Sequence, residues 1–145
     1  MRAVLQRVSL ASVEVRGQTV GDIERGYVVL LGICEGDSLQ KAEKMVEKIR
    51  KLRIFADENG KTNLSSEDIA GDILIISQFT LYADCQKGNR PSFAGAGSPD
   101  LAKELYEHFI EMCQGKFNKV AHGSFGEHMH ITLTNDGPFT LILED

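Results

Sequence analysis

A run of polar side chains ends one of the most apolar stretches of the chain. Ser77-Gln78-Phe79-Thr80-Leu81 follows Asp72-Ile73-Leu74-Ile75-Ile76. Two hydroxyls, an amide and exposed main-chain N–H groups at a strand end can converge on a ligand, and Thr80 is the candidate nucleophile. The structural alternative is that Ser and Thr here only bond to nearby backbone. No Gly-x-Ser-x-Gly motif or nearby His–Asp pair indicates a conventional activated nucleophile.

A second polar segment lies near the C-terminus. Asn135-Asp136-Gly137-Pro138 separates two expected strands, Met129–Thr134 and Phe139–Leu143. These residue types are typical of a hairpin turn. Glycine also lets another molecule approach the backbone closely, and proline permits a cis peptide bond. The segment is therefore either a turn or a backbone contact for a ligand.

Three histidines raise the alternative of a metal hydrolase. His128 and His130 are two residues apart on an expected strand and so share one face, with His122 nearby. No carboxylate is fixed by spacing, and isolated surface histidines explain the pattern more simply. Cys34, Cys85 and Cys113 are far apart and are expected to be reduced thiols. We expect no metal and no cofactor.

The elements that position these residues follow from hydrophobic periodicity. Alternating residues predict strands over 2–8, 10–15 and 19–23, with a hairpin at Arg16-Gly17-Gln18. The apolar runs over 26–34 and 72–81 are typical of strands buried on both faces. Residues 83–97, which hold three glycines and a proline, predict a long loop of the kind that is often functional.

Two helices are expected. After Asp37-Ser38, a plausible cap, apolar residues recur at helical spacing: Leu39, Ala42, Met45, Val46, Ile49 and Leu52. Ser98-Pro99 opens a second helix, with Ser98 as its cap and an apolar face of Leu101, Leu105, Phe109 and Met112. The sequence predicts an α+β fold: a curved, mostly antiparallel, barrel-like sheet with two packed helices.

Composition limits the classes of function. The 145 residues fit a single domain, 1–145, with no apolar run of membrane-spanning length. Charge interrupts the N-terminal Met1–Arg7 segment, so export is not indicated and the cytoplasm is the expected location. A net charge of -5 argues against a general nucleic-acid coat protein and against a DNA-binding function.

A non-catalytic tRNA-binding module is the second alternative. Lysines form a stripe along the first expected helix, and Lys87, Asn89 and Arg90 lie in the long loop. The stripe consists of Lys41, Lys44, Lys48 and Lys51. A solvated helix face explains the stripe more simply. A binding module of this kind would leave an aminoacyl ester intact.

The two polar segments together resemble the two signature motifs of the D-aminoacyl-tRNA deacylases, in the same order and in a chain of the same length. Further stretches resemble the family pattern: Gln6-Arg7-Val8, Ala11-Ser12-Val13, Arg53-Ile54-Phe55, Gly88 to Phe93, Ser98-Pro99 and Gly123 to Met129. Thr62 departs from it, since many members have methionine there. The combination of both motifs with these flanks is specific, and the resemblance covers the whole chain.

The resemblance implies a homodimeric hydrolase that acts on the ester joining a D-amino acid to the terminal adenosine of tRNA. It implies action on glycine mischarged on tRNA as well, because glycine has no side chain to reject. Gly137 and Pro138 would form a cis peptide that enters the pocket of the other subunit and rejects L-amino acids, which is chiral proofreading of translation. The expected partners are aminoacyl-tRNA and a second copy of the chain, with no membrane and no DNA.

The resemblance also assigns roles within the two motifs. Main-chain carbonyls of Gly137 and Pro138 would hold the substrate amino group, with Asn135 in the same motif and Arg7 holding it in place across the interface. Main-chain N–H groups around Phe79 and Thr80 would stabilise the oxyanion. Ser77 and Gln78 would shape the adenosine site. Because no base accompanies Thr80, we favour attack by water, assisted by the ribose 2′-hydroxyl, over attack by Thr80.

Overall fold

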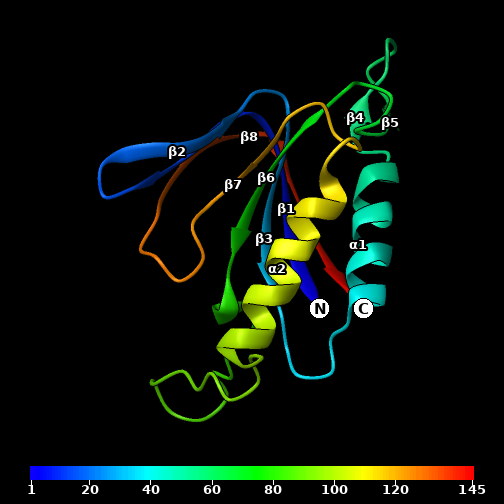
Figure 1. Cartoon of the computed structure of the whole chain (residues 1–145). Helices are drawn as coiled ribbons and strands as arrows, with labels where there is room; N and C mark the ends of the chain where they lie inside the picture. The colour runs from blue at the N-terminus through cyan, green and yellow to red at the C-terminus, as the bar shows by residue number, and fades with distance from the viewer.

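The long N-terminal strand β1 (Arg2–Val15) organises the sheet in the computed structural model, which describes residues 1–145 (Figure 1). One edge of β1 pairs with β3 (Gly26–Gly32) and then with β2 (Gln18–Ile23), and the other edge pairs with β8 (His130–Glu144); all three pairings are antiparallel. Strand β3 pairs in parallel with β6 (Asp72–Ser77), and β6 in parallel with β7 (Val120–His122). The parallel pairings were not predicted.

The sheet curves until its two ends nearly meet. A Cβ added at Gly21 of β2 would lie 3.1 Å from the carbonyl oxygen of His122 in β7, so glycine lets these strands approach each other. The resulting surface is a nearly closed barrel, which removes most exposed strand edges. The predicted α+β class, with a barrel-like sheet and two helices, is confirmed.

Alternate residues of β3 and β6 enter two separate cores, as the continuous apolar runs predicted. Tyr27, Val29, Ile73 and Ile75 pack against the helices, whereas Val28 and Leu74 point into the barrel. Helices α1 (Leu39–Lys51) and α2 (Pro99–Cys113) lie side by side on the outer face of the sheet (Figure 1). The sheet is therefore a rigid layer between two apolar interiors.

The helix starts agree with the sequence only in part. The Ser38 side chain accepts a hydrogen bond from the Lys41 N–H, so the predicted cap of α1 is confirmed. Ser98 is the N-cap residue of α2 with Pro99 in the first turn, as predicted, but its side chain makes no capping hydrogen bond. Its own N–H instead donates to the Glu35 carboxylate at 2.8 Å. A short hairpin of β4 (Phe55–Ala56) and β5 (Thr62–Leu64) follows α1.

The strand predicted over 72–81 ends early. Gln78 makes the last bond of the ladder, from its N–H to the Leu31 carbonyl, and the chain then turns into the short 3-10 helix η1 (Phe79–Tyr82). The predicted long loop over 83–97 follows, so the polar motif sits at a sharp change of direction.

Of the two alternatives for Asn135–Pro138, the hairpin turn is wrong. Both flanking segments belong to β8 and pair with the same strand in the same direction, so the chain does not reverse. Gln6 pairs with Thr140 and Val8 with Asn135, so two steps along β1 oppose five along β8. The surplus residues bulge out of the sheet.

No helix of the structure has the length and apolar character needed to cross a membrane.

Candidate functional site

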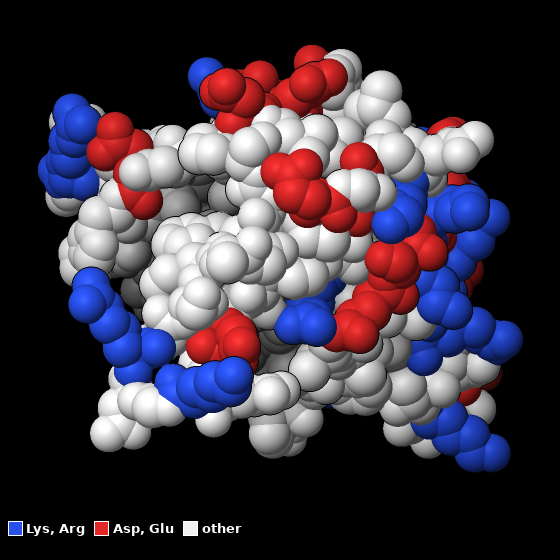
Figure 2. Space-filling model, turned by 90° about the horizontal axis from the view of Figure 1, so that it is seen from below, with Lys and Arg blue, Asp and Glu red and all other residues white.

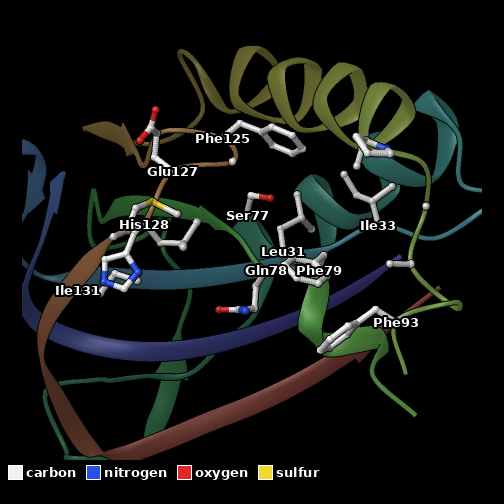
Figure 3. A pocket seen from close by; sticks show the side chains of 17 residues that line it. Leu31, Ile33, Ser77, Gln78, Phe79, Phe93, Phe125, Glu127, His128 and Ile131 are labelled. Carbon is white, nitrogen blue, oxygen red and sulfur yellow. The ribbon is translucent and has the colours of Figure 1, made fainter. Parts of the chain in front are cut away.

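A cavity of about 610 Å³ opens where the parallel strands β3 and β6 end. The crevice beyond the carboxyl ends of parallel strands is a common ligand site, because the chain diverges there into separate loops. Its walls come from β3, β6, η1, the 83–97 loop, α2 and the β7–β8 loop (Figure 3). The volume lies within the range of small-molecule sites.

Ser77 and Gln78 line this cavity, and Thr80 does not. Figure 3 shows the Ser77 side chain directed into the cavity from the end of β6, and its hydroxyl has no hydrogen-bond partner in the chain. The Gln78 amide donates to the Thr80 hydroxyl on the exposed side of η1. No His, Asp or Glu bonds to Thr80, so nothing in this chain is placed to remove its proton.

The N–H groups of Phe79 and Thr80 lie at the start of η1. The first N–H groups of a helix have no partner within it. None of the main-chain hydrogen bonds of turns and loops uses either group, although the neighbouring Gln78 and Leu81 N–H groups are bonded. Two main-chain donors thus remain free beside the cavity.

Two aromatic rings form part of the rim. Phe79 and Phe93 meet edge to face with ring centroids 5.1 Å apart, and about half of each side chain is exposed (54% and 42%). Exposed aromatic faces of this kind can stack on a flat ring such as a nucleobase. Phe93 comes from the 83–97 loop, which is anchored by the bond from the Gly97 N–H to the Ile33 carbonyl.

The back wall is held by Tyr106 of α2. Its buried hydroxyl lies within hydrogen-bond distance of two carbonyls, that of Ile75 at 2.9 Å and that of Gly123 at 3.2 Å. These contacts connect β6 to the residue that follows β7. Burial raises the pKa of Tyr106, so the hydroxyl stays a proton donor. Its ring packs 5.8 Å from Phe125, which lines the cavity. Sequence reasoning took this position only as part of a helix and missed its role.

The second motif is held rigidly in its bulge. The Asn135 side chain accepts a hydrogen bond from the Phe139 N–H at 2.6 Å, and the Gly137–Pro138 peptide bond is cis. Gly137 has φ +141°, and a Cβ there would lie 2.9 Å from the Phe139 nitrogen, so only glycine fits.

Arg7 braces this bulge from below. Its Nε donates to the Asp136 carbonyl at 2.9 Å and lies 3.3 Å from the Asp136 carboxylate, and its guanidinium lies 4.8 Å from the Phe139 ring centroid. These contacts are within one chain. β1 places Arg7 directly beneath its own chain's bulge, and the action of Arg7 across a subunit interface stays a prediction.

A single chain does not bring the two motifs together. Ser77 is in register with Leu31, and Arg7 with Tyr27, four residues earlier along β3. At about 3.3 Å per residue, the motifs are offset by about 13 Å along the strands. Gly137 and Pro138 do not line the cavity and remain exposed. The exposed bulge is therefore accessible to another molecule.

Two of the three histidines that suggested a metal site lie next to each other. His128 and His130 have ring centroids 4.9 Å apart, and His128 lines the cavity. His122 lies against the Gly123 carbonyl. No group of three His, Cys, Asp or Glu side chains has the spacing of a metal site.

Known proteins match this chain over nearly its whole length. The family described as D-Tyr-tRNA(Tyr) deacylase matches residues 4–144. A D-aminoacyl-tRNA deacylase of Thermosipho africanus is 56% identical over 144 residues, which are 99% of this chain and 97% of that protein. A solved c-Myc DNA unwinding element binding protein is 42% identical, with a TM-score of 0.94 over 100% of this chain and 99% of its own. A probable eukaryotic D-amino acid tRNA deacylase, 20% identical over 98% and 97% of the two chains, shares the fold with a TM-score of 0.87.

Proposed function

The chain belongs to the D-Tyr-tRNA(Tyr) deacylase family, and on that premise we propose that it removes D-amino acids and glycine, but not L-amino acids, from tRNA. The reaction adds water to the ester carbonyl, releases the free amino acid and returns the proton to the ribose oxygen. The observation that carries the proposal is the cavity itself: it is large enough for a terminal nucleoside with its amino acid, it is lined by Phe79, and the N–H groups of Phe79 and of the next residue, Thr80, have no main-chain partner. An aminoacyl ester is already activated, so stabilising its oxyanion supplies much of the catalysis.

Ser77 and Gln78 shape the nucleoside part of the site in this proposal. The free Ser77 hydroxyl offers a hydrogen bond inside the cavity, and Phe79 with Phe93 offers a stacking surface for the base. The N–H groups of Phe79 and Thr80 point at the reacting carbonyl. Each residue thereby serves binding or charge stabilisation, and none removes a proton.

Selection against L-amino acids is assigned to the bulge of a second subunit. A selector that accepts many D side chains has to read the arrangement around Cα and not the side chain. The rigid carbonyls of Gly137 and Pro138 suit this role, but their own chain holds them away from its cavity. The free edge of β8, with Ile142 66% exposed, offers a surface for pairing with a second copy.

The decisive experiment compares D-Tyr-tRNA with L-Tyr-tRNA, with and without EDTA. We expect rapid loss of the D ester, persistence of the L ester and no effect of the chelator. Loss of activity with EDTA would revive the histidine metal alternative, and equal loss of both esters would remove the selector from the proposal. Loss of neither ester, with binding of uncharged tRNA retained, would favour a tRNA-binding module.

Replacement of Thr80 by alanine tests the choice between water and Thr80 as nucleophile. Because no base contacts the Thr80 hydroxyl, we expect kcat to fall by less than about tenfold. A decrease of this size corresponds to the loss of the hydroxyl that accepts the Gln78 hydrogen bond. Single-turnover hydrolysis of D-Tyr-tRNA is the measurement, with Thr134→Ala, an exposed threonine of β8, as control. A fall of three or more orders of magnitude would show that Thr80 carries the reaction.

DNA binding is a second candidate only because the 42% identical solved protein carries that name. A duplex needs an extended basic surface, and this chain has a net charge of -5. The cavity admits one nucleoside end rather than a duplex. We therefore place the nucleic-acid contact at a single-stranded terminus.

A further inference from the structure

The loop between η1 and α2 projects beyond the rest of the molecule at the cavity end (Figure 1). Asp84 and Ser92 bond to each other through both their main-chain groups, at 2.8 and 2.9 Å, and close the base of this loop. Residues 85–91 therefore form a protruding tip. Phe93, directly after the base, lines the cavity, so the tip stands at the cavity entrance.

Lys87 and Arg90 are the cations of this tip. Both are exposed, and neither takes part in an ion pair or a side-chain hydrogen bond. Most other cations near the cavity are neutralised: Arg16 pairs with Glu127 and Arg2 with Glu144. In a chain of net charge -5, two free cations beside the entrance mark the side on which a polyanion is attracted.

The opposite side of the entrance repels a polyanion. Helix α2 borders the cavity through Pro99 and Ala102, and its exposed carboxylates include Asp100 and Glu104, which take part in no ion pair, whereas Glu107 pairs with Lys103. Seen from below, a hollowed and mostly uncharged area has basic groups along one side and acidic groups along another (Figure 2). A strand of phosphates that leaves the cavity is attracted by the loop tip and repelled by the free carboxylates of α2.

We propose that the 85–91 tip is the contact site for the phosphates of the single-stranded 3′ end of tRNA, immediately before the terminal adenosine. Lys87 and Arg90 bind these phosphates as exposed charges, without reading the bases. This inference rests on the proposed function, because it takes the terminal adenosine to occupy the cavity. It assigns affinity for the nucleic acid to the loop and chemistry to the cavity.

The test uses two substrates that differ only in their phosphates: D-Tyr-tRNA and D-tyrosyl-adenosine, the ester of the nucleoside alone. For Lys87→Glu/Arg90→Glu we expect KM for D-Tyr-tRNA to rise about tenfold with kcat retained. Hydrolysis of D-tyrosyl-adenosine should not change. In Lys87→Ala/Arg90→Ala, the slope of log(kcat/KM) against log[salt] should become shallower by about 1.4, which is about 0.7 for each lost phosphate contact.

Lys44→Glu/Lys48→Glu is the matched control. These two lysines are also exposed and unpaired and undergo the same change of charge, but they lie on α1, which does not line the cavity. An equal rise in KM for this control would overturn the proposal in favour of overall charge. Equal losses on both substrates would overturn it in favour of a structural role of the loop. Wild-type protein that hydrolyses neither substrate would instead overturn the proposed function.

Discussion

Replacement of Arg7 by alanine is expected to lower kcat/KM for D-Tyr-tRNA about 100-fold. The guanidinium bonds to the Asp136 carbonyl and covers the Phe139 ring, both in β8, and it also bonds to the Ile54 carbonyl. It therefore fixes the bulge relative to β1, which carries Arg7, and to the segment at Ile54. Its side chain is only 13% exposed. A displacement of a positioning group by about 1 Å can cost a factor of about 100 in rate. Steady-state hydrolysis of D-Tyr-tRNA measures the loss.

Arg25→Ala is the control for this variant. The Arg25 guanidinium also lies over an aromatic ring, 5.4 Å from the Phe55 centroid, but it does not contact the bulge. We expect Arg25→Ala to keep nearly full activity and both variants to keep native circular dichroism. Full activity of Arg7→Ala would show that the bulge keeps its position without the Arg7 contacts. Arg7 would then not be a positioning residue.

Mixed dimers distinguish action within a subunit from action across an interface. Arg7→Ala subunits retain an intact cavity, whereas Ala96→Trp subunits, with a filled cavity, retain an intact bulge. If the bulge serves the other subunit, co-refolded equal mixtures of the two inactive variants should recover about a quarter of the wild-type activity, because half of the dimers have one complete site. A mixture that stays inactive would place the bulge's action in its own chain or elsewhere.

The two motifs also show where sequence reasoning reaches its limit. The helix cap at Asp37-Ser38 and the buried strand predicted over 26–34 depend on local patterns; Ser38 is the cap, and the strand is present as Gly26–Gly32, two residues shorter than predicted. Asn135–Pro138 has the local composition of a turn, yet a bulge forms because β8 pairs with β1 on both sides of it. That outcome depends on contacts more than a hundred residues apart along the chain. No periodicity within the segment encodes them.

The cavity was even less accessible from pattern alone. Ser77 and Gln78 were singled out by their polar character at a strand end, but Phe93, Phe125 and Tyr106 have the residue types of any apolar core. Tyr106 differs from its neighbours only through two carbonyls that converge on its hydroxyl, and these lie on other strands. The family resemblance placed the motifs, whereas their offset along the strands emerged only from the register.

Asp37→Asn is expected to cause the largest loss of stability, about 3 to 5 kcal/mol, or roughly 10 °C in Tm. The Asp37 side chain is fully buried and lies 2.6 Å from the Met1 ammonium, which is equally buried. Its other oxygen accepts the Cys34 N–H at 2.9 Å. An asparagine leaves the buried ammonium without a countercharge beside Lys41. Urea unfolding at pH 6.5 measures the difference, and Asp22→Asn, which breaks an exposed pair with Lys119, should cost less than about 1 kcal/mol.

The pH dependence of this difference gives a second, independent check. Burial alone would raise the pKa of Asp37, but the bonds from the Cys34 N–H and the Met1 ammonium outweigh it, so the pKa is lowered. A lowered pKa means that the ionised carboxylate stabilises the fold at every pH above the unfolded value of about 3.9. That contribution is lost as the pH falls through the folded value. Wild type should therefore exceed Asp37→Asn by a constant margin between about pH 5 and 7, and the margin should shrink below about pH 4. A margin that does not shrink at all as the pH falls would mean that packing, and not the charge pair, accounts for the loss.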